Sequence, residues 1–468
     1  MTTFKEKVLE LGSTTHNFPL PSYSLIGEAD DTWSQLASMK VFKPASSALS
    51  LDLLDIVPSD SQPCGRTTRT FNDTEEFIDY LNHSPINGGL RSISICQKNS
   101  WASLKICQPM LESIMRKHDI MPEFLETVRC FHDKTCNVEE AFGGSSWKRC
   151  TPLRKELTFV MKYPEHNGRT DGADPWSIRQ TGVYQSFDTA KKTSIWILLN
   201  PRENTVAENR TKGLLNTQDG FSDPQGQPPL LGLIVLSIYL NNWRTYMTYY
   251  EKEELRMSGI VISAVIDEKL QFSHSTLSQL RRLEARLLLL SPIFQSLIQA
   301  IHLLEAFNDS LQDYGSVSDK AQKATQEILQ NYNNIAIAYS QNATFILNKI
   351  RGTAQLLSDT LNLKHQQTSQ TISKNTLALN DMAVKDSATI RVITVVTLLF
   401  LPAQFIATLF GMQFFSTDSS GTSMVSSSSL WIFFAIATPF TLATFGYWKW
   451  MERKQRLKAK LDELGQKC

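Results

Sequence analysis

Two long apolar stretches stand close together near the end of the chain, at residues 388–410 and 430–448. The first has 23 residues and a single charge, Arg391 near its start, and the second has 19 residues with aromatic side chains at both ends. A helix of 23 residues measures about 34 Å, which is enough to cross a hydrocarbon core of about 30 Å. Aromatic side chains at the ends suit the membrane interface. The pattern predicts two transmembrane helices, and a pair of buried core helices is the alternative.

Positive charge is unevenly distributed around these stretches. The connecting loop, residues 411–429, has no Lys or Arg and one acidic residue, Asp418. The tail at 449–468 instead begins with a basic stretch, 449–460, whose six basic residues are Lys449, Arg453, Lys454, Arg456, Lys458 and Lys460. By the positive-inside rule the tail lies in the cytoplasm, and two spans place the preceding N-terminal part there as well. We expect an integral membrane protein with both termini cytoplasmic, in the plasma membrane first and an internal membrane as the alternative.

The region before the first apolar stretch predicts unusually long helices. No proline occurs between Pro292 and Pro402, and the clearest break is the Gly- and Ser-containing segment 313–319. We predict a helix at 276–312 and another that starts at Asp319 and runs into the first span. Apolar residues recur there at steps of three and four, close to an 11-residue period, which is typical of long, nearly straight helices packed side by side. About 100 Å of such a helix needs partners, either the preceding helix or copies of itself in a symmetric oligomer.

A polar stripe runs along the first apolar stretch. At alternating steps of three and four it contains Ser387, Ile390, Thr394, Thr397, Leu401, Gln404, Thr408 and Gly411, six of which are polar or Gly. The other faces of this helix are almost wholly apolar. A glutamine in the middle of a membrane is costly unless it meets another polar group or water. The stripe predicts either a pore wall built by several copies or helix–helix packing through small and polar residues, and the pattern alone favours neither.

The N-terminal part predicts a mixture of strands and helices. Residues 1–85 are Ser-rich with weak periodicity, so we expect them to be poorly structured. Runs rich in Ile, Val, Tyr and Phe predict strands at 90–96, 157–163, 177–187, 194–199 and 231–240. We also expect helices at 100–117 and 243–254, a hairpin at 188–192 and a mobile loop at 201–229. The fold class is therefore α+β: a cytoplasmic α/β domain at 86–275, long helices at 276–387 and two C-terminal transmembrane helices.

Composition and motifs remove several classes of function. The 468 residues carry a net charge of +1, whereas a dedicated nucleic-acid-binding protein has a clear basic excess. The seven cysteines include no C-x-x-C pair, so their spacing does not support a structural zinc site. Motifs such as G-x-G-x-x-G, G-x-S-x-G and H-E-x-x-H are missing. His302 and Glu305 suit a metal-ligand pair, but a solvated helix face explains them better. We expect no enzyme, no resident cofactor and no nucleic-acid partner.

A short motif, Phe410-Gly411-Met412-Gln413-Phe414, ends the first span. It follows the long helix and precedes a short loop, a second span and a basic tail. In this combination the C-terminal region resembles the CorA family of magnesium and divalent-metal transporters, although that family has Gly-Met-Asn where this chain has Gly-Met-Gln. Residues 174–184 and 196–199 look like the divergent fungal branch of the family. The resemblance is strong over 260–460 and weaker over 90–259.

The resemblance implies a funnel-shaped homopentamer in which the first spans surround the pore. It also implies that the motif contacts the hydrated ion at the outer mouth. In this chain the mouth would consist of Gly411, Met412 and Gln413. The resemblance selects the pore interpretation of the polar stripe, with an apolar constriction at Leu401. The other expected pore-lining residues are Thr394, Thr397, Gln404 and Thr408.

The function implied is a homopentameric channel or transporter that moves divalent ions, Mg²⁺ first, down their electrochemical gradient. Its partners would be its own copies, divalent ions and membrane lipids, with Mg²⁺ as the transported or a regulatory ion. Regulatory sites in the family use acidic residues between cytoplasmic subunits, and the candidates here are Asp309, Asp313 and Asp319. The alternative is a non-transporting, membrane-anchored oligomer that senses metal or binds a partner. Gln413 and the acid-poor loop favour this alternative.

Overall fold

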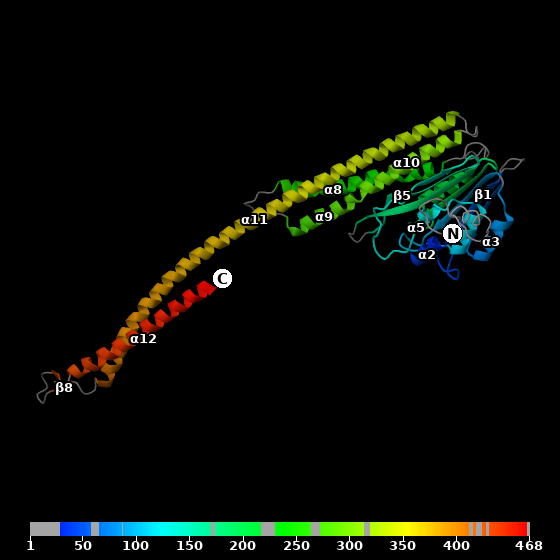
Figure 1. Ribbon diagram of the computed structural model, residues 1–468. Coiled ribbons are helices and arrows are strands. Elements are labelled where there is room, and N and C mark those ends of the chain that lie inside the picture. The colour runs from blue at the N-terminus through cyan, green and yellow to red at the C-terminus, as the bar shows by residue number, and fades with distance from the viewer. Residues whose placement is uncertain are drawn as a thin grey trace, which may run out of the picture. The chain divides into compact units, whose positions relative to one another are not determined.

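The computed structural model of the protein describes residues 29–57, 65–86, 88–169, 174–216, 230–263, 272–312, 319–410, 415–417, 424–426 and 430–465. Contacts divide the chain into two compact units, Met1–Leu361 and Asn362–Cys468 (Figure 1). The first unit contains a mixed sheet with helices on both faces. The second contains the C-terminal helices. Helix α11 (Asp319–Phe410) contributes residues to both units.

A seven-stranded sheet organises the first unit, with the strand order β2-β1-β3-β7-β6-β5-β4. The strands are β1 (Leu51–Val57), β2 (Gly65–Phe71), β3 (Gly89–Cys96), β4 (Trp147–Cys150), β5 (Arg154–His166), β6 (Trp176–Asp188) and β7 (Thr193–Asn200). Strands β3 and β7 pair in parallel, and every other neighbouring pair is antiparallel. The parallel pair requires a long connection, which the chain makes through α4 (Gln108–Lys117), α5 (Phe124–Arg129) and the hairpins of β4, β5 and β6.

The central strands are apolar because both faces of the sheet are covered. All eight residues of β7 are buried. Successive side chains of a strand point to opposite faces. Accordingly Trp196 and Leu198 join one core, and Ile195 and Ile197 join the other. Burying one such side chain contributes about 1.5–3 kcal/mol, so these two cores hold the unit together.

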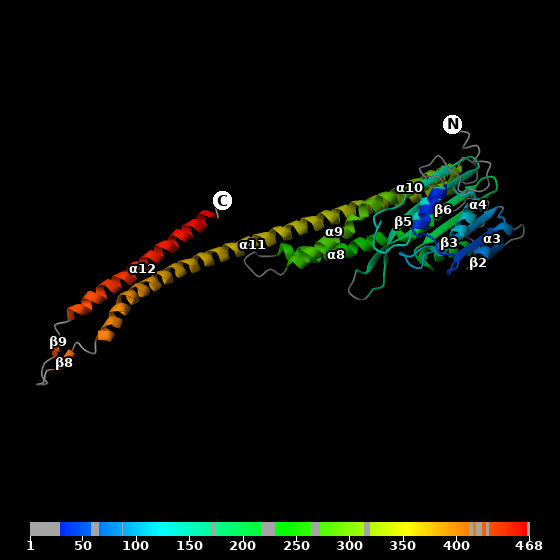
Figure 2. The ribbon, with the colours of Figure 1, turned by 60° about the horizontal axis from the view of Figure 1, so that its bottom comes forward.

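Different helices cover the two faces (Figure 2). One core includes α2 (Ala29–Ser38), α3 (Thr74–His83), α4 (Gln108–Lys117) and α5 (Phe124–Arg129). The other includes α6 (Val206–Asn216), α7 (Leu231–Tyr239), α8 (Asn242–Ile262), α9 (His274–Leu288), α10 (Leu290–Gln312) and the first part of α11. Asp73 caps α3 by accepting hydrogen bonds from the backbone N–H groups of Glu75 and Glu76.

The second unit is a helical hairpin. It contains the C-terminal part of α11 and α12 (Leu430–Gly465). Two short strands, β8 (Phe415–Thr417) and β9 (Met424–Ser426), pair antiparallel between the helices. The guanidinium Nη1 of Arg391 on α11 lies 3.7 Å from the Oε1 atom of Glu452 on α12. Arg391 lies near the start of the predicted first span, and Glu452 lies shortly after the predicted second span. The ion pair therefore joins α11 and α12 where the first span begins and the second has ended.

Several predicted elements are confirmed. The strands expected at 90–96, 157–163, 177–187 and 194–199 lie within β3, β5, β6 and β7. The hairpin at 188–192 joins β6 to β7, and the Asp188 carboxylate accepts hydrogen bonds from the backbone N–H groups of Ala190 and Lys191. The helix expected at 276–312 is present as α9 and α10, and the helix expected from Asp319 is α11.

The prediction of a strand at 231–240 is wrong, because this segment forms helix α7. Its run of Leu, Ile and Val fits a buried strand as well as a buried helix. The residues that it buries, such as Leu231, Val235 and Tyr239, recur every four positions, which is the helical period. Gly232 lies against Leu304 and Phe159, so α7 approaches α10 and the sheet closely.

Three further expectations also need correction. Residues 1–85 include α2, β1, β2 and α3 among the described positions. The helix expected at 100–117 begins only at 108, where Pro109 supplies a backbone angle suited to a first turn. The loop expected at 201–229 contains α6, and its remaining positions 217–229 lie outside the described residues. The missed signal is Thr205-Val206-Ala207-Glu208, a capping sequence in which the Thr205 hydroxyl accepts a hydrogen bond from the Glu208 N–H.

Candidate functional site

Two described helical stretches are long and apolar enough to cross a membrane. The first, His274–Leu311, comprises α9 and most of α10, and 44% of its most apolar window is buried against the rest of the first unit. It therefore acts as a core element of that unit. The second, Lys320–Thr408, is only 12% buried over its most apolar window, and it includes the predicted first span. The predicted second span, 430–448, is helical within α12.

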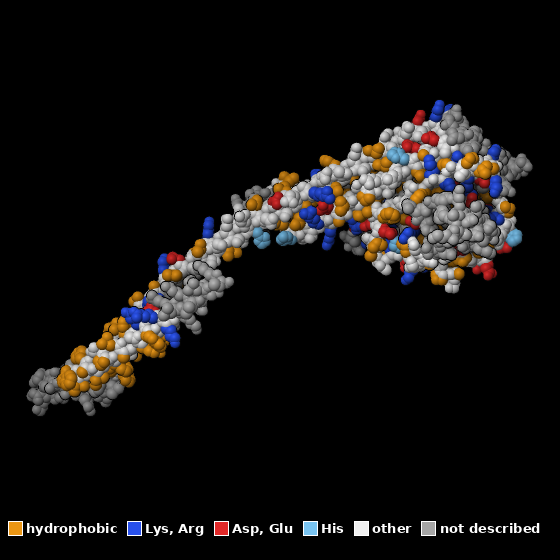
Figure 3. Space-filling view, in the orientation of Figure 1, with side chains coloured by type: hydrophobic (Ala, Val, Ile, Leu, Met, Phe, Trp, Pro, Cys, Tyr) orange, Lys and Arg blue, Asp and Glu red, His pale blue; other side chains and the backbone are white. Residues whose placement is uncertain are grey.

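Large apolar side chains are exposed along both C-terminal helices (Figure 3). On α11 the exposed fraction is 69% for Phe400 and 61% for Phe405, and on α12 it is 68% for Trp431 and 65% for Leu442. A soluble surface rarely exposes a continuous apolar area of this kind. A lipid environment or neighbouring subunits account for it, which agrees with a membrane-spanning hairpin.

Within this unit one side of α11 is covered and another is open. Pro402 and Ile406 are buried, and Val395 and Leu398 are half-buried, so the covered residues recur at steps of three and four. At about 100° per residue, the polar stripe lies on a different side of the helix. Its members Thr397, Leu401, Gln404 and Thr408 are exposed, and Thr394 is half-buried. The structure thus brings the five expected pore-lining residues to one side of α11 and leaves four of them without cover in a single chain.

The threonines of the stripe share one hydrogen-bonding arrangement. The hydroxyl of Thr394 donates to the carbonyl oxygen of Ile390 at 2.8 Å, and that of Thr397 donates to the carbonyl oxygen of Ile393 at 2.8 Å. The hydroxyl of Thr408 donates to the carbonyl oxygen of Gln404 at 2.7 Å. These bonds satisfy the hydroxyl protons within the helix. The oxygen atoms keep their lone pairs for groups outside it.

The expected mouth and metal residues are only partly described. Gly411, Met412, Gln413 and Asp313 lie outside the described residues. Asp309 is exposed on α10, and Asp319 is the first residue of α11. Within the described ranges no three His, Cys, Asp or Glu side chains come together in a way that could hold a metal ion. The side chains of His302 and Asn333 are hydrogen-bonded to one another instead, with the His302 Nε2 and Asn333 Nδ2 atoms 3.2 Å apart.

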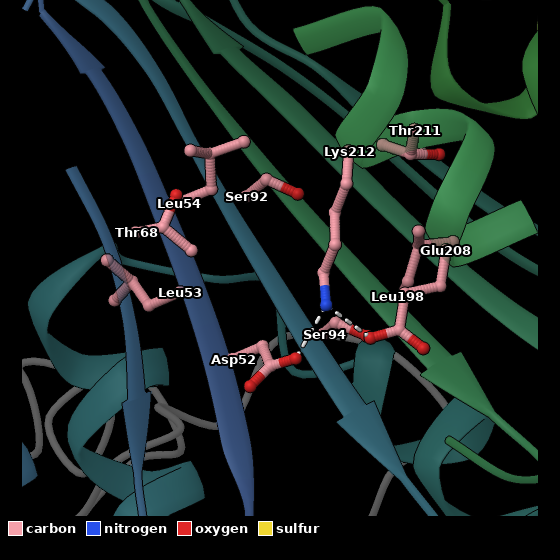
Figure 4. Close-up of a pocket in the computed structure, with 10 residues that line it drawn as sticks. All are labelled: Asp52, Leu53, Leu54, Thr68, Ser92, Ser94, Leu198, Glu208, Thr211 and Lys212. Atoms are coloured by element: carbon pink, nitrogen blue, oxygen red, sulfur yellow. Dashed lines mark hydrogen bonds and ion pairs between the residues drawn. The ribbon is translucent and has the colours of Figure 1, made fainter. Parts of the chain in front are cut away.

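A polar hollow lies in the first unit between the sheet and α6, at the end of the parallel strands (Figure 4). The ammonium group of Lys212 stands between two carboxylates, 2.6 Å from Asp52 Oδ2 and 2.9 Å from Glu208 Oε1. A neighbouring cavity of about 220 Å³ continues it past Cys96 and Glu203. Sequence reasoning missed this site because its charged residues, Asp52, Glu208 and Lys212, come from segments expected to be poorly structured or mobile, 1–85 and 201–229.

The two carboxylates of this hollow share one ammonium group. Burial alone would raise the pKa of the Asp52 carboxyl, but hydrogen bonds from Lys212 and Thr70 outweigh it and hold the pKa below its usual value. Burial would lower the pKa of Lys212, and its bonds to Asp52 and Glu208 raise it instead. Burial and the nearby Glu208 raise the pKa of the Cys96 thiol to about 12, which makes this thiol unreactive. The ammonium group of Lys212 is thus the cation that these two carboxylates bind in the structure.

Comparison with models of protein families gives a match within the first unit. A family model described as CorA-like transporters matches residues 31–156 and 153–258. This match falls on the part in which the sequence resemblance is weaker, and it does not extend over 260–460. None of the curated proteins compared with the chain matches it.

Three solved structures are similar to this chain at low identity. The complete CorA magnesium transporter of Methanocaldococcus jannaschii has 11% identity and a TM-score of 0.41, over 86% of this chain and 98% of that one. The full-length CmaX protein has 12% identity and a TM-score of 0.36, over 88% and 100%. The cytoplasmic domain of ZntB from Vibrio parahaemolyticus has 10% identity and a TM-score of 0.34, over 68% and 99%. Because these TM-scores lie below 0.5, the likeness to a family rests on the family model alone, by which residues 31–156 and 153–258 of this chain match the CorA-like transporters.

Proposed function

We propose that this protein is a channel or transporter that moves divalent metal ions across a membrane as a homopentamer, with Mg²⁺ as its principal ion. Ions would pass down their electrochemical gradient, because no motif for energy coupling or covalent chemistry is present in the sequence. The observation that carries the proposal is the exposed polar stripe of α11, with Gln404 in the middle of an apolar span. Both termini would lie in the cytoplasm, with the plasma membrane as the first expectation.

The stripe supports an assembly because a single chain leaves its polar side chains, above all the Gln404 amide, without polar partners outside the helix. An amide within hydrocarbon needs a polar partner or water, and Gln404 lies away from the covered side of α11. Copies arranged around a symmetry axis would bring these side chains to a shared, water-filled centre. Thr394, Thr397, Gln404 and Thr408 would then line the path, with Leu401 as an apolar constriction. The number of five copies and the position within a fungal branch are inferred from the resemblance.

The chemistry of the Gly411-Met412-Gln413 motif supports hydrated Mg²⁺ as the ion and the motif as its point of entry. Mg²⁺ dehydrates reluctantly, so a ring of amide and carbonyl oxygens that binds the hydrated ion suits it. Gly411, Met412 and Gln413 would form that ring at the outer mouth. Gln413 carries one methylene more than the asparagine of the family, which moves each amide further from the backbone. Mg²⁺ is the cargo in this proposal, and Asp309, Asp313 and Asp319 are the candidates for a regulatory site between subunits.

A double substitution in the stripe tests the pore wall. We expect Gln404→Leu with Thr408→Leu to reduce Mg²⁺ entry into proteoliposomes at least about tenfold, because an apolar wall of this width no longer holds water. Phe405→Leu, next to the stripe and outside it, is the matched control and should leave entry close to the unaltered level. Equal oligomer mass in detergent for all three proteins shows that assembly is preserved. Undiminished entry through the double variant would exclude this stripe as the pore wall.

A second candidate is a non-transporting oligomer that senses metal or binds a partner from the cytoplasm. The loop between the spans favours it, because Asp418 is its one acidic residue and the motif has glutamine in place of asparagine. A weak field at the mouth attracts few cations. A protein of this class would pass no ion in the same proteoliposomes even though its oligomer is intact.

A further inference from the structure

The proposed path has no acidic side chain to select cations. From Val392 to Thr417 the sequence contains no charged residue, so a ring of carboxylates cannot set the sign of the permeating ion over this length. Over this length, the polar side chains that the stripe offers are three threonines and one glutamine. Discrimination between a cation and an anion must therefore come from how these neutral groups present hydrogen-bond donors and acceptors.

The threonine hydroxyls present acceptors. A hydroxyl has one proton and two lone pairs. The protons of Thr394, Thr397 and Thr408 are donated to backbone carbonyl oxygens four residues earlier, at 2.7–2.8 Å. These bonds lie inside the helix and do not depend on a neighbouring subunit. Towards the open side of the stripe, each of these residues offers oxygen lone pairs without a donor. The Gln404 amide offers both a donor and acceptors, so it does not discriminate by itself.

Hydrated ions differ in the atoms that they present outwards. Water around a cation turns its oxygen to the ion and both hydrogens to the wall, whereas water around an anion points one hydrogen at the ion and presents its oxygen and one hydrogen outwards. An acceptor-only wall therefore accepts twice as many hydrogen bonds from each water of a cation's shell, and it leaves the outward oxygens of an anion's shell without a donor. We propose that Thr394, Thr397 and Thr408 form such a wall and select hydrated cations over anions by charge sign. This inference rests on the proposed function, and it names what these threonines contribute to the pore.

Threonine-to-valine exchange removes the acceptors at nearly constant shape. The test compares the unaltered protein with the triple variant Thr394→Val, Thr397→Val and Thr408→Val in planar bilayers under a MgCl₂ gradient. The reversal potential gives the Mg²⁺-to-Cl⁻ permeability ratio. Because the hydrated cation then loses three hydrogen-bond acceptors along its path, we expect the ratio to fall at least about tenfold. The triple serine variant should keep the ratio, because a serine hydroxyl donates to the same backbone oxygen.

The second helix supplies a matched control. The hydroxyls of Thr438, Thr441 and Thr444 on α12 also donate to backbone carbonyl oxygens, but they lie outside the stripe. Their triple valine variant should leave the permeability ratio unchanged. The inference is overturned if the stripe variant keeps the ratio, if the α12 variant changes it equally, or if the unaltered protein passes Cl⁻ as readily as Mg²⁺. An unaltered, correctly assembled protein that passes neither ion overturns the pore itself, which is a separate outcome.

Discussion

Arg91 and Asp55 form a fully desolvated ion pair inside the sheet. The guanidinium of Arg91 bonds both carboxylate oxygens at 2.7 Å, and the two side chains are 1% and 7% exposed. Arg91 also donates to the carbonyl oxygen of Ser84, and the Tyr80 hydroxyl donates to Asp55. The pair thereby ties β1 and β3 to the end of α3. A pair of this kind is costly to break, because the remaining partner is left buried and charged.

We predict that Arg91→Met lowers the free energy of unfolding by about 3–5 kcal/mol, since it leaves the Asp55 carboxylate without its partner. Urea unfolding of the full chain in detergent, followed by tryptophan fluorescence, measures this change. The double variant Arg91→Met with Asp55→Leu should regain much of the loss, because it removes both charges together. A double variant less stable than Arg91→Met would show that the pair does not act in this way.

The half-buried His118 makes the first unit sensitive to acid. Burial, and then the nearby Arg91 and Arg154, lower the pKa of His118 from 6.5 to about 3. Between these two pKa values the unfolded chain binds more protons than the folded one, so the free energy of unfolding falls as the pH drops from 6.5 towards 3. We predict that His118→Asn flattens this pH dependence in urea titrations. Parallel curves for the unaltered protein and His118→Asn would contradict the assignment.

At the scale of the elements, local sequence specified those with a clear period or cap. The strand candidates, most of them rich in Ile, Val, Tyr and Phe, predicted β3, β5, β6 and β7, and the proline-free stretch predicted α10 and α11. Strand β2 was not predictable, because as a polar edge strand, with Thr67 and Thr68 exposed, it lacks an apolar pattern. Helix α7 was misassigned because its half-buried positions, such as Leu233 and Ile234, are as apolar as its buried ones, so the sequence lacks the polar contrast that separates the two periods. The polar stripe was readable from spacing alone, whereas the Lys212 hollow required tertiary contacts between distant segments.

The packing of α7 can be tested through two glycines. A Cβ atom at Gly232 would stand 2.7 Å from Leu304 Cδ2 and 3.0 Å from Phe159 Cζ. We predict that Gly232→Ala destabilises the protein by about 1–3 kcal/mol through overpacking. Gly213 in α6 has no neighbour within 4 Å, so Gly213→Ala should stabilise the protein by about 0.5–1 kcal/mol. Urea midpoints of both variants give the two signs, and equal effects would contradict the packing of α7 described above.

At the scale of the whole molecule, the family match and the proposed ion path lie in different units. The first contains the residues matched by the family model, and the second contains the proposed ion path. The family consists of transporters, in agreement with the expectation that the chain is not an enzyme. The exposed apolar side chains of α11 and α12 and the basic tail after residue 448 both follow from a membrane-spanning hairpin. The polar stripe of α11 favours assembly of several hairpins, because its side chains need polar partners or water within the membrane.

Mg²⁺ entry into proteoliposomes, followed by an internal fluorescent reporter, tests the central claim most directly. The unaltered protein is compared with Gln413→Asn, which restores the asparagine of the family at the proposed mouth. We predict entry through the unaltered protein that follows the ion gradient, and a changed rate in the variant because each amide moves closer to the backbone. Entry through the variant alone would mean that the pore is intact but closed to Mg²⁺ at Gln413. No entry through either protein, with the oligomer intact, would contradict the account and favour a sensor.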